Sequence, residues 1–372
     1  MNKFVFRSVG QGLFYTGSLL NGSYNFVYDC GNDNQKILNK EIQIYQDEIN
    51  NNCKKKPQVD FVVISHLHKD HYSGLFELVK KFHVRKIYLP YLSCSKDVLR
   101  LYLYYDLFID NQQSENLQEN LITYRLIASL YRLDDNNFYR EYIDEIDPIE
   151  ESKKAEYYDN NNVYWKFKFI YNKFDSNKVD LVNEKCRVFL KKSHCNSMEE
   201  FIEQNRKNID LIAKAYKEVF GEENELNNTS IVLLHYPAEE RNYLSYCNFN
   251  NFVHRRFLCY EHRICCCCMQ ERPSDATTLL TGDIIFNKTI ANELLRDIKG
   301  RTVSVLQVPH HGSKENWEAF CQHNINSVIY LIPFGYGNRY RHPNINVIDD
   351  LIHNNEEFYC ATQNQGFVYY ID

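Results

Sequence analysis

The sequence predicts an α/β fold in which two β-sheets carry helices on their outer faces. Short runs rich in β-branched and aromatic residues lie toward both ends of the chain, and runs with helical periodicity lie between them. Several of the strand-like runs end directly in His or Asp residues. Because α/β folds assemble their sites from residues at strand ends, these groups predict a site at one edge of the sheets.

The segment 59–74, VDFVVISHLHKDHYSG, carries the strongest signal. An apolar strand, Val59–Ser65, is followed by four metal-ligand side chains within six positions and then by a helical run. Imidazole and carboxylate groups are ligands that a borderline cation such as Zn²⁺ prefers. A loop at a strand end lets these side chains converge on one point. Because this loop directly follows a buried strand, a chance surface loop rich in His and charge is disfavoured. The four residues are His66, His68, Asp70 and His71.

Composition favours a cytoplasmic protein with a large core. Hydrophobic residues make up 44% of the 372-residue chain and aromatic residues 15%. The formal net charge of −6 argues against a generally basic surface that coats nucleic acid, although a local basic patch is compatible with it. No run approaches about 18 apolar residues and the start is strand-like rather than a signal peptide, so we expect no membrane span. The 13 Cys, scattered and odd in number, suit reduced thiols.

The N-terminal part predicts the strands that lead to the ligand segment. Residues 3–31 have the pattern of a β-meander, residues 35–52 that of a helix, and residues 84–89 that of a further strand. Asp29 follows the last meander strand and precedes a Gly turn. Such an Asp is either ordinary turn chemistry or the partner that orients a metal-bound His, and we favour the second role because the ligand segment is near.

Two insertions interrupt the pattern. Residues 94–160 predict a helical insertion, with an acidic stretch at its end that we expect to be solvated helix and loop. Residues 237–274 predict a long irregular insertion rich in Cys and Arg. A strand at 163–171 and an amphipathic helix at 198–220 separate the two insertions.

The C-terminal part repeats the alternation of strand and helix. Strands are predicted at 230–236, 276–281, 303–308 and 327–332, with helices between the later ones, a helix at 346–353 and a closing hairpin that ends at Ile371. Gly282-Asp283 follows the second of these strands, and Pro309-His310-His311-Gly312-Ser313 follows the third. A two-metal site needs a carboxylate that can bridge ions about 3.5–4 Å apart. We assign Asp283 as this bridge and one of His310 and His311 as the last ligand.

In order along the chain, these motifs resemble those of a metallo-β-lactamase-fold hydrolase. Within that superfamily the chain is most similar to the nuclease-like domain of the competence (DNA-uptake) protein ComEC and to its stand-alone relatives. The resemblance implies a single domain over residues 1–372, built as a four-layer αβ/βα sandwich, with insertions at about 94–160 and 237–274. The motifs that carry it are Val9-Gly10-Gln11-Gly12, Tyr28-Asp29-Cys30-Gly31, His66-Leu67-His68-Lys69-Asp70-His71, Asn228-Thr229-Ser230, Leu280-Thr281-Gly282-Asp283, Pro309–Ser313 and Asn338–Pro343.

The resemblance implies two divalent metal ions at one edge of the sandwich. His66 and His68 would hold the first ion, Asp70 and His71 the second, and Asp283 would bridge them. One of His310 and His311 would join the second ion, while the other contacts substrate. Many relatives have a further His on the first ion, and no residue fills that place convincingly here; the candidates are Asn228, His235, His254 and His262. We expect Zn²⁺, with Mn²⁺ as the alternative if the first ion is held loosely.

The implied chemistry is hydrolysis by a metal-bridged hydroxide, because a bridging water has a depressed pKa. We expect a phosphodiesterase or nuclease in which Asp70 serves catalysis as a ligand, Arg339 contacts the phosphate and His342 donates a proton to the leaving group. The alternative for 335–343 is a turn with solvated arginines. Nucleic acid, DNA rather than RNA, or a phosphodiester small molecule would be the substrate. Family analogy suggests a protein partner in DNA uptake or anti-phage defence.

Other functions stay open at this point. The same site serves esters of small molecules such as phosphorylcholine esters, cyclic nucleotides or lactones, and a degenerate site would make a non-catalytic binding module. Lactam hydrolysis is disfavoured by the missing secretion signal and the large insertions. The stretch 259–268 would form a structural zinc knuckle or hold plain thiols, including Cys265–Cys268. Its arginines, with the lysines of 185–192, would form a basic phosphate-binding surface or a solvated face.

Overall fold

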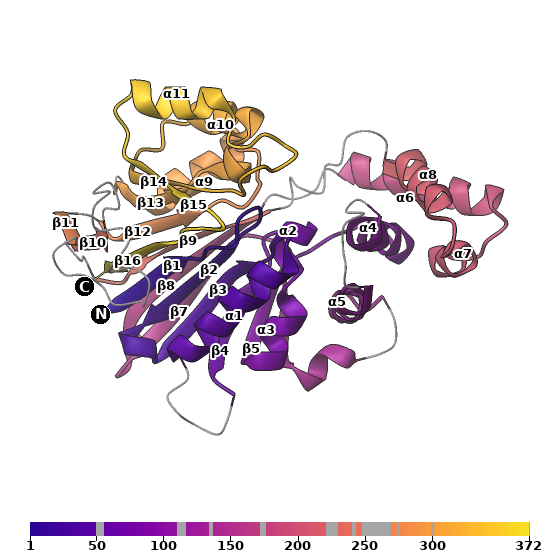
Figure 1. Ribbon diagram of the computed structural model, residues 1–372, viewed down its shortest axis with the longest axis horizontal. Coiled ribbons are helices and arrows are strands. Elements are labelled where there is room, and N and C mark those ends of the chain that lie inside the picture. Colours follow the sequence, from indigo (N-terminus) through magenta and orange to yellow (C-terminus); the bar gives the residue numbers. More distant parts are fainter. Residues whose placement is uncertain are drawn as a thin grey trace.

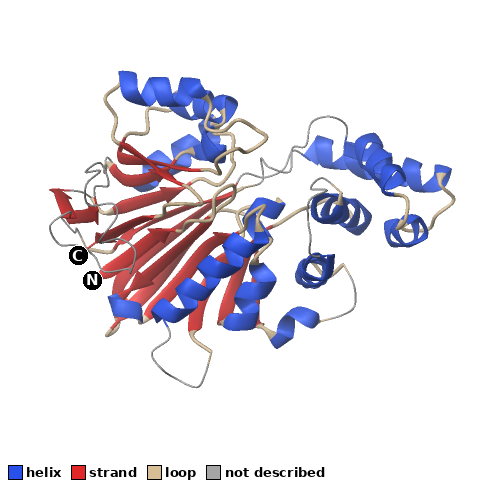
Figure 2. Ribbon diagram, in the orientation of Figure 1, coloured by secondary structure: helices blue, strands red, loops and turns tan. Residues whose placement is uncertain are grey.

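The structure is a computed structural model of the chain, and it describes residues 1–49, 56–109, 117–133, 137–171, 176–220, 230–239, 243–247, 269–273, 275–298 and 301–371. Within these residues the strands form two sheets that pack face to face, with helices on the outer faces (Figures 1 and 2). The predicted α/β class is therefore confirmed. The chain has the layers helix, sheet, sheet and helix in that order.

The first sheet contains the N-terminal meander and the strand that precedes the ligand segment. The meander strands are antiparallel, and the strands that follow them up to β6 are parallel. In spatial order the sheet is β11 (Met269–Pro273), β10 (Tyr243–Cys247), β16 (Phe367–Ile371), β1 (Asn2–Phe6), β2 (Phe14–Leu19), β3 (Tyr24–Cys30), β4 (Gln58–Val63), β5 (His83–Pro90) and β6 (Ile143–Ile149).

The second sheet contains the strands that precede Asp283 and the His pair. Its C-terminal strands are parallel to one another, and the remainder are antiparallel. In spatial order the sheet is β15 (Phe358–Ala361), β14 (Ser327–Pro333), β13 (Val303–Gln307), β12 (Thr277–Leu280), β9 (Ile231–Pro237), β8 (Asn162–Tyr171) and β7 (Lys153–Asp159).

Three groups of helices surround the sheets (Figure 1). The first group covers the first sheet, the second covers the other sheet, and the third, which we call the helical lobe, projects to one side. Among the described helices, none is both long and apolar enough to cross a bilayer. The groups are α1 (Gln35–Ile49), α2 (Lys69–Tyr72) and α3 (Leu75–Lys81); α9 (Lys288–Ile298), α10 (Lys314–Cys321) and α11 (Ile345–His353); and α4 (Lys96–Phe108), α5 (Leu117–Leu130), α6 (Ser176–Lys192), α7 (Met198–Asn205) and α8 (Ile209–Phe220).

Aromatic side chains dominate the layer between the sheets. Phe26 stacks on Phe61 with ring centroids 5.0 Å apart, and Phe167 packs edge-on against both rings. These side chains are buried, as expected for inward-facing positions of two facing sheets. Rigid packing here fixes the relative position of the two sheets, and so it fixes the distance between the site residues that each sheet carries.

Several predicted elements are wrong. The acidic stretch is not helix and loop but forms β6 and β7, because its charged residues alternate with residues that pair and pack against neighbouring strands. The supposed irregular insertion contains the antiparallel pair β10 and β11. The closing hairpin does not exist as such, since β15 and β16 belong to different sheets. The single helix at 198–220 is two helices, with a turn at Asn205–Asn208 between them. Helix α6 was not predicted.

Candidate metal centre

The ligand segment leaves β4 and turns into the short helix α2, which begins at Lys69 with His68 as its N-cap. The predicted loop is therefore partly helical. Its backbone is held by the meander, because the amide of Leu13 donates to the carbonyl of Asp70 at 3.1 Å. A Cβ atom on Gly31 would lie 2.3 Å from the peptide between Asp70 and the next residue. The glycine of the Asp29-Cys30-Gly31 motif thus permits the close approach that places the ligand helix.

Six of the predicted ligands form two groups within the described residues. His66, His68 and Asp283 make the first group, and Asp70, His71 and His311 make the second. Within each group the candidate ligand atoms lie within 4.8 Å of one another. The second group therefore includes His311 rather than His310. Loops from both sheets contribute to each group.

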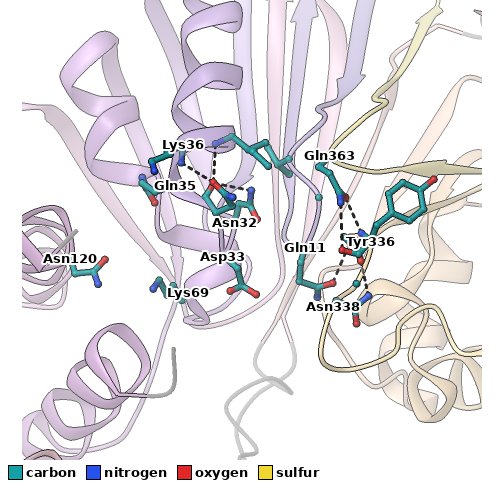
Figure 3. A pocket seen from close by; sticks show the side chains of 16 residues that line it. Gln11, Asn32, Asp33, Gln35, Lys36, Lys69, Asn120, Tyr336, Asn338 and Gln363 are labelled. Carbon is teal, nitrogen blue, oxygen red and sulfur yellow. Dashed lines mark hydrogen bonds between the residues drawn. The ribbon is translucent and has the colours of Figure 1, made fainter. Parts of the chain in front are cut away.

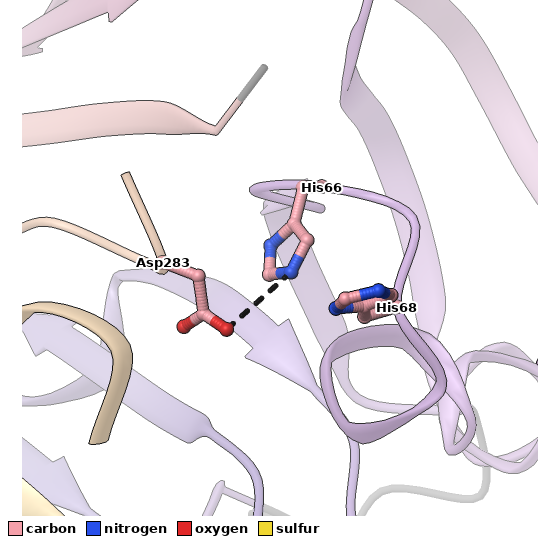
Figure 4. Close-up of side chains that lie close together, drawn as sticks. All are labelled: His66, His68 and Asp283. Atoms are coloured by element: carbon pink, nitrogen blue, oxygen red, sulfur yellow. Dashed lines mark ion pairs between the residues drawn. The ribbon is translucent and has the colours of Figure 1, made fainter. Parts of the chain in front are cut away.

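Asp283 stands between the two groups. Its Oδ2 lies 3.6 Å from Nε2 of His66 (Figure 4) and 3.5 Å from Nε2 of His310. Its Oδ1 lies 3.3 Å from Nε2 of His71 and 3.9 Å from Nε2 of His311. Each carboxylate oxygen thus faces one histidine from the ligand segment and one from the His pair, which is the arrangement that a bridging carboxylate requires.

Hydrogen bonds fix which nitrogen of His71 and His66 carries the proton. Nδ1 of His71 lies 2.7 Å from Oδ2 of Asp29, so its N–H donates to that carboxylate. Ser65 donates its only hydroxyl hydrogen to Asp29 at 2.6 Å, and its oxygen therefore accepts from Nδ1 of His66 at 3.0 Å. Both rings then turn their Nε2 atoms toward Asp283. Asp29 orients His71, as a partner of a metal-bound His would.

The His pair follows the same rule. Nδ1 of His311 donates to the carbonyl of Pro333 at 2.9 Å. Asn316 donates its amide hydrogens to the carbonyls of Asp283 and Ile284, so its Oδ1 must face outward and accept from Nδ1 of His310 at 3.1 Å. Both rings of the pair thus turn their Nε2 atoms toward the carboxylates, and Nε2 of His311 lies 3.2 Å from Oδ2 of Asp70.

These side chains fit divalent cations. Nε2 of His66, Nε2 of His71 and Oδ1 of Asp283 are buried and have no hydrogen-bond partner. Leaving such atoms unpaired costs about 1–3 kcal/mol each, so their presence in a native protein needs a cause. Ligands about 2.0–2.1 Å from a tetrahedral ion are roughly 3.3–3.5 Å apart, which is close to the 3.3–3.6 Å that separates Asp283 from His66, His71 and His310.

The charges in the centre are strongly coupled. Burial opposes ionisation of Asp283 and Asp70, but the neighbouring histidines outweigh burial and hold the pKa of both carboxyls well below the usual range. Burial lowers the pKa of His66 and His68, which favours the neutral form of both rings. For His71 the surrounding carboxylates outweigh burial and raise the pKa of the ring. Cations would therefore displace protons from this cluster, and binding should weaken in acid.

Of the four candidates for the further ligand of the first ion, the structure describes His235. His235 is not a ligand: it lies in the core, with Nε2 2.8 Å from the hydroxyl of Tyr15 and Nδ1 accepting from Trp165 at 3.2 Å. Its polar atoms are satisfied because β9 directs the ring between the sheets rather than to their edge. Asn228, His254, His262 and the Cys265–Cys268 run lie outside the described residues.

The predicted catalytic residues follow β14. His342 lines a cavity of about 210 Å³ beside the ligands, and its Nδ1 is buried without a hydrogen-bond partner. Burial, then the charge of His310, lowers the pKa of His342 to about 4. Arg339 is exposed, and its guanidinium lies over the ring of Tyr340, 4.7 Å from the centroid. Tyr340, which the sequence did not single out, lines the cavity instead.

A second cavity of about 490 Å³ adjoins the first, and Gln11, Asp33 and Lys69 line both (Figure 3). Its wall is rich in amides, among them Asn32, Gln35, Asn120, Asn338 and Gln363. Burial, then the charge of Asp70, raises the pKa of Asp33 to about 6. The sequence did not single out these residues because they come from six separate parts of the chain and are not themselves metal-ligand types at ligand spacing.

The helical lobe also reaches the centre. Asp106 of α4 lines the smaller cavity and accepts a hydrogen bond of 2.6 Å from the hydroxyl of Tyr72, directly after the ligand segment. Of the predicted basic surface, the structure describes Lys185 to Lys192 on α6, whereas Arg255, Arg256 and Arg263 lie outside the described residues. Arg187 and Lys192 instead pair with Glu184 and Glu218.

Comparison with known proteins gives a match to one family profile over part of the chain. The sequence matches no curated protein. Among solved structures, the chain is similar to the crystal structure of Tm1679, a metal-dependent hydrolase of the beta-lactamase superfamily, with 10% identity, a TM-score of 0.40 and 98% of each chain covered. Residues 14–121, which contain the whole ligand segment, match the sequence profile of the Metallo-beta-lactamase superfamily. This part of the chain is therefore similar to that superfamily, and the two face-to-face sheets agree with the sandwich fold that the motifs predict.

Proposed function

We propose that the chain is a metal-dependent phosphodiesterase or nuclease of the ComEC type, which prefers DNA to RNA. The observation that carries the proposal is the pair of ligand groups that share Asp283, beside two polar cavities. The histidine-rich ligand set favours Zn²⁺ over Mg²⁺ or Ca²⁺, with Mn²⁺ as the alternative. A protein partner in DNA uptake or anti-phage defence is part of the proposal on family resemblance alone.

Two divalent cations in these groups would supply an activated water and would neutralise charge that develops on the ester oxygens. The chain contributes the orientation of the ligands, through Asp29 and Asn316, and a buried setting that strengthens electrostatic interactions. Lys69 lines both cavities and places positive charge where an anionic substrate would pass. Asp70 serves as a ligand.

His342 and Arg339 have proposed roles at the rim. An anionic substrate would raise the pKa of His342, which allows its ring to donate a proton to the leaving group. Arg339, held against Tyr340, would contact the phosphate from the exposed side. Tyr340 in turn stacks on His342, with ring centroids 6.0 Å apart, so the three side chains would act as one unit.

A small-molecule ester is the second candidate substrate. A volume of about 490 Å³ lies within the range of small-ligand pockets, about 300–1,000 Å³. Its lining includes one aromatic residue, Tyr336, and many amides, which suits a polar substrate such as a cyclic nucleotide better than an apolar lactone. The same centre without two ions would make a binding module.

The first test is metal content, followed by hydrolysis of bis(p-nitrophenyl) phosphate, single- and double-stranded DNA, and RNA with Zn²⁺ or Mn²⁺. The Asp70→Ala/His71→Ala double variant should lose cleavage by a factor of about 10³ or more. His353→Ala, on the exposed side of α11, is the matched control and should keep full activity. Two bound ions without phosphodiester cleavage would move the assignment to a small-molecule ester, and the absence of stoichiometric metal would remove the enzymatic proposal.

A further inference from the structure

We propose that His310 completes the ligand set of the first cation, together with His66, His68 and Asp283. This inference rests on the proposed metal centre and assigns the position for which the sequence offered Asn228, His235, His254 and His262 as candidates. The His pair is then divided between the ions, with His310 on the first and His311 on the second.

The backbone of the pair brings about this division. His310 and His311 both have left-handed conformations, with φ of 49° and 54°, and they lie in a tight turn directly after β13. Such conformations are unfavourable for residues with a Cβ atom and persist where the surrounding structure enforces them. The result is that Nε2 of His310 lies 3.5 Å from Oδ2 of Asp283, whereas Nε2 of His311 faces Oδ1 and Asp70.

His310 shares its carboxylate oxygen with an established member of the first group. Oδ2 of Asp283 lies 3.6 Å from Nε2 of His66 and 3.5 Å from Nε2 of His310. These distances are close to the edge of a ligand tetrahedron, roughly 3.3–3.5 Å for nitrogen and oxygen donors. Among the described ion pairs, His310 pairs with Asp283 and not with Asp70.

The tautomer of His310 favours a cation over a substrate as its partner. Asn316 fixes the proton on Nδ1, so Nε2 carries a lone pair toward the centre. A lone pair repels the oxygens of a phosphate or carboxylate ester and attracts a divalent cation. The side chain is 29% exposed and lines the smaller cavity, so an ion that enters from solvent can reach it.

His235, the upstream candidate that the structure describes, is not available to a cation. Both ring nitrogens of His235 are engaged, by Tyr15 and Trp165, in the layer between the sheets. A shift of this ring to the edge would leave both partners without a hydrogen bond in a buried setting. His310 needs no such rearrangement, because its Nε2 already faces the shared carboxylate.

The test counts bound zinc by mass spectrometry after dialysis of each full-length variant against buffered Zn²⁺. The wild type should retain two ions and His310→Ala one, with the affinity for the lost ion weaker by at least about 100-fold. The double variants identify which ion is lost. His310→Ala/His66→Ala should still retain one ion, because both substitutions remove ligands of the first ion. His310→Ala/His71→Ala should retain none, because it removes a ligand from each ion.

The proposal is overturned if His310→Ala keeps both ions at wild-type affinity. It is also overturned if the two double variants show the reverse pattern, which would place His310 on the second ion. His310→Gln, similar in size and still polar, serves if the alanine variant fails to fold, and His353→Ala is the control for loss of an exposed histidine. Two ions in the wild type without phosphodiester hydrolysis would remove the proposed function and leave the metal assignment intact.

Discussion

Within the described residues, buried histidines occur in the candidate metal centre and in the core between the sheets, and the two settings differ in how the polar atoms are used. The metal centre contains His66 and His71, whose Nε2 atoms have no hydrogen-bond partner. The core cluster consists of His235 with Tyr15, Trp165, Tyr369 and Thr278, which form a connected chain of hydrogen bonds. His66, His71 and His235 are all fully buried.

Burial therefore does not separate a functional histidine from a structural one in this fold. The difference is whether the protein itself satisfies both ring nitrogens. In the core cluster it does, and the ring remains neutral because burial lowers the pKa of His235 to about 3. In the metal centre one nitrogen of each ring is anchored and the other is left facing carboxylates, which is an environment that a cation completes.

Removal of the core histidine should give the largest effect on stability. His235→Ala creates a cavity and leaves Trp165 and Tyr15 without partners, so the free energy of unfolding should fall by about 3–4 kcal/mol. Denaturant unfolding measures this loss. The zinc content of His235→Ala should stay at two ions. Loss of an ion with unchanged stability would show instead that His235 is a metal ligand.

A substitution of Asp29, the hydrogen-bond partner of His71, should lower the affinity for metal rather than the free energy of unfolding. Asp29→Asn keeps the shape of the side chain but removes the charge that orients His71, so zinc affinity should fall by about 10–100-fold. Competition with a chromophoric chelator measures this affinity. Asp60→Asn is the matched control, because Asp60 is also a buried carboxylate on the first sheet but contacts Arg85 and Asn25 rather than the centre. Equal affinities in the two variants would contradict the role of Asp29.

The pH dependence of stability should reveal the neutral state of His235. Its pKa is lowered from 6.5 to about 3 in the folded chain, so the unfolded chain binds the additional proton as the pH falls below 6.5. The stability from this neutral ring is complete above pH 6.5 and is lost toward pH 3, at up to about 1.4 kcal/mol per pH unit. In chelator, the wild type should show a steeper acid loss than His235→Gln. Parallel curves would mean that the ring is not held neutral.

The sequence alone pointed to the residues that the structure gathers in the candidate metal centre, because each of them stands in a short motif directly after a strand. The ligand segment, Asp283 and the His pair each follow a strand, and the strands that precede them carry strong apolar patterns. Local pattern also predicted most strands of both sheets. It failed for β6 and β7, where charged residues on the solvent side hide an alternation that only the neighbouring strands make visible.

Features that depend on three-dimensional contacts could not be predicted from sequence patterns. Whether His235 points to the edge or the core depends on the path of β9 between the sheets, which no spacing encodes. The division of the His pair depends on backbone angles and on Asn316, six residues after His310. Asp106 and Asn120 reach the cavities from the helical lobe, whose five helices come from two separate parts of the chain.

The second ligand group joins side chains that are 241 positions apart, Asp70 and His311, and these come from opposite sheets. Contacts of such long sequence separation close a large loop and form late in folding. During synthesis the ligand segment emerges long before its partners, so the nascent chain can offer only a partial and weak site. A cation that binds the complete ligand set binds the folded sandwich and not the unfolded chain. By mass action, the free energy of unfolding would therefore rise with the concentration of free metal.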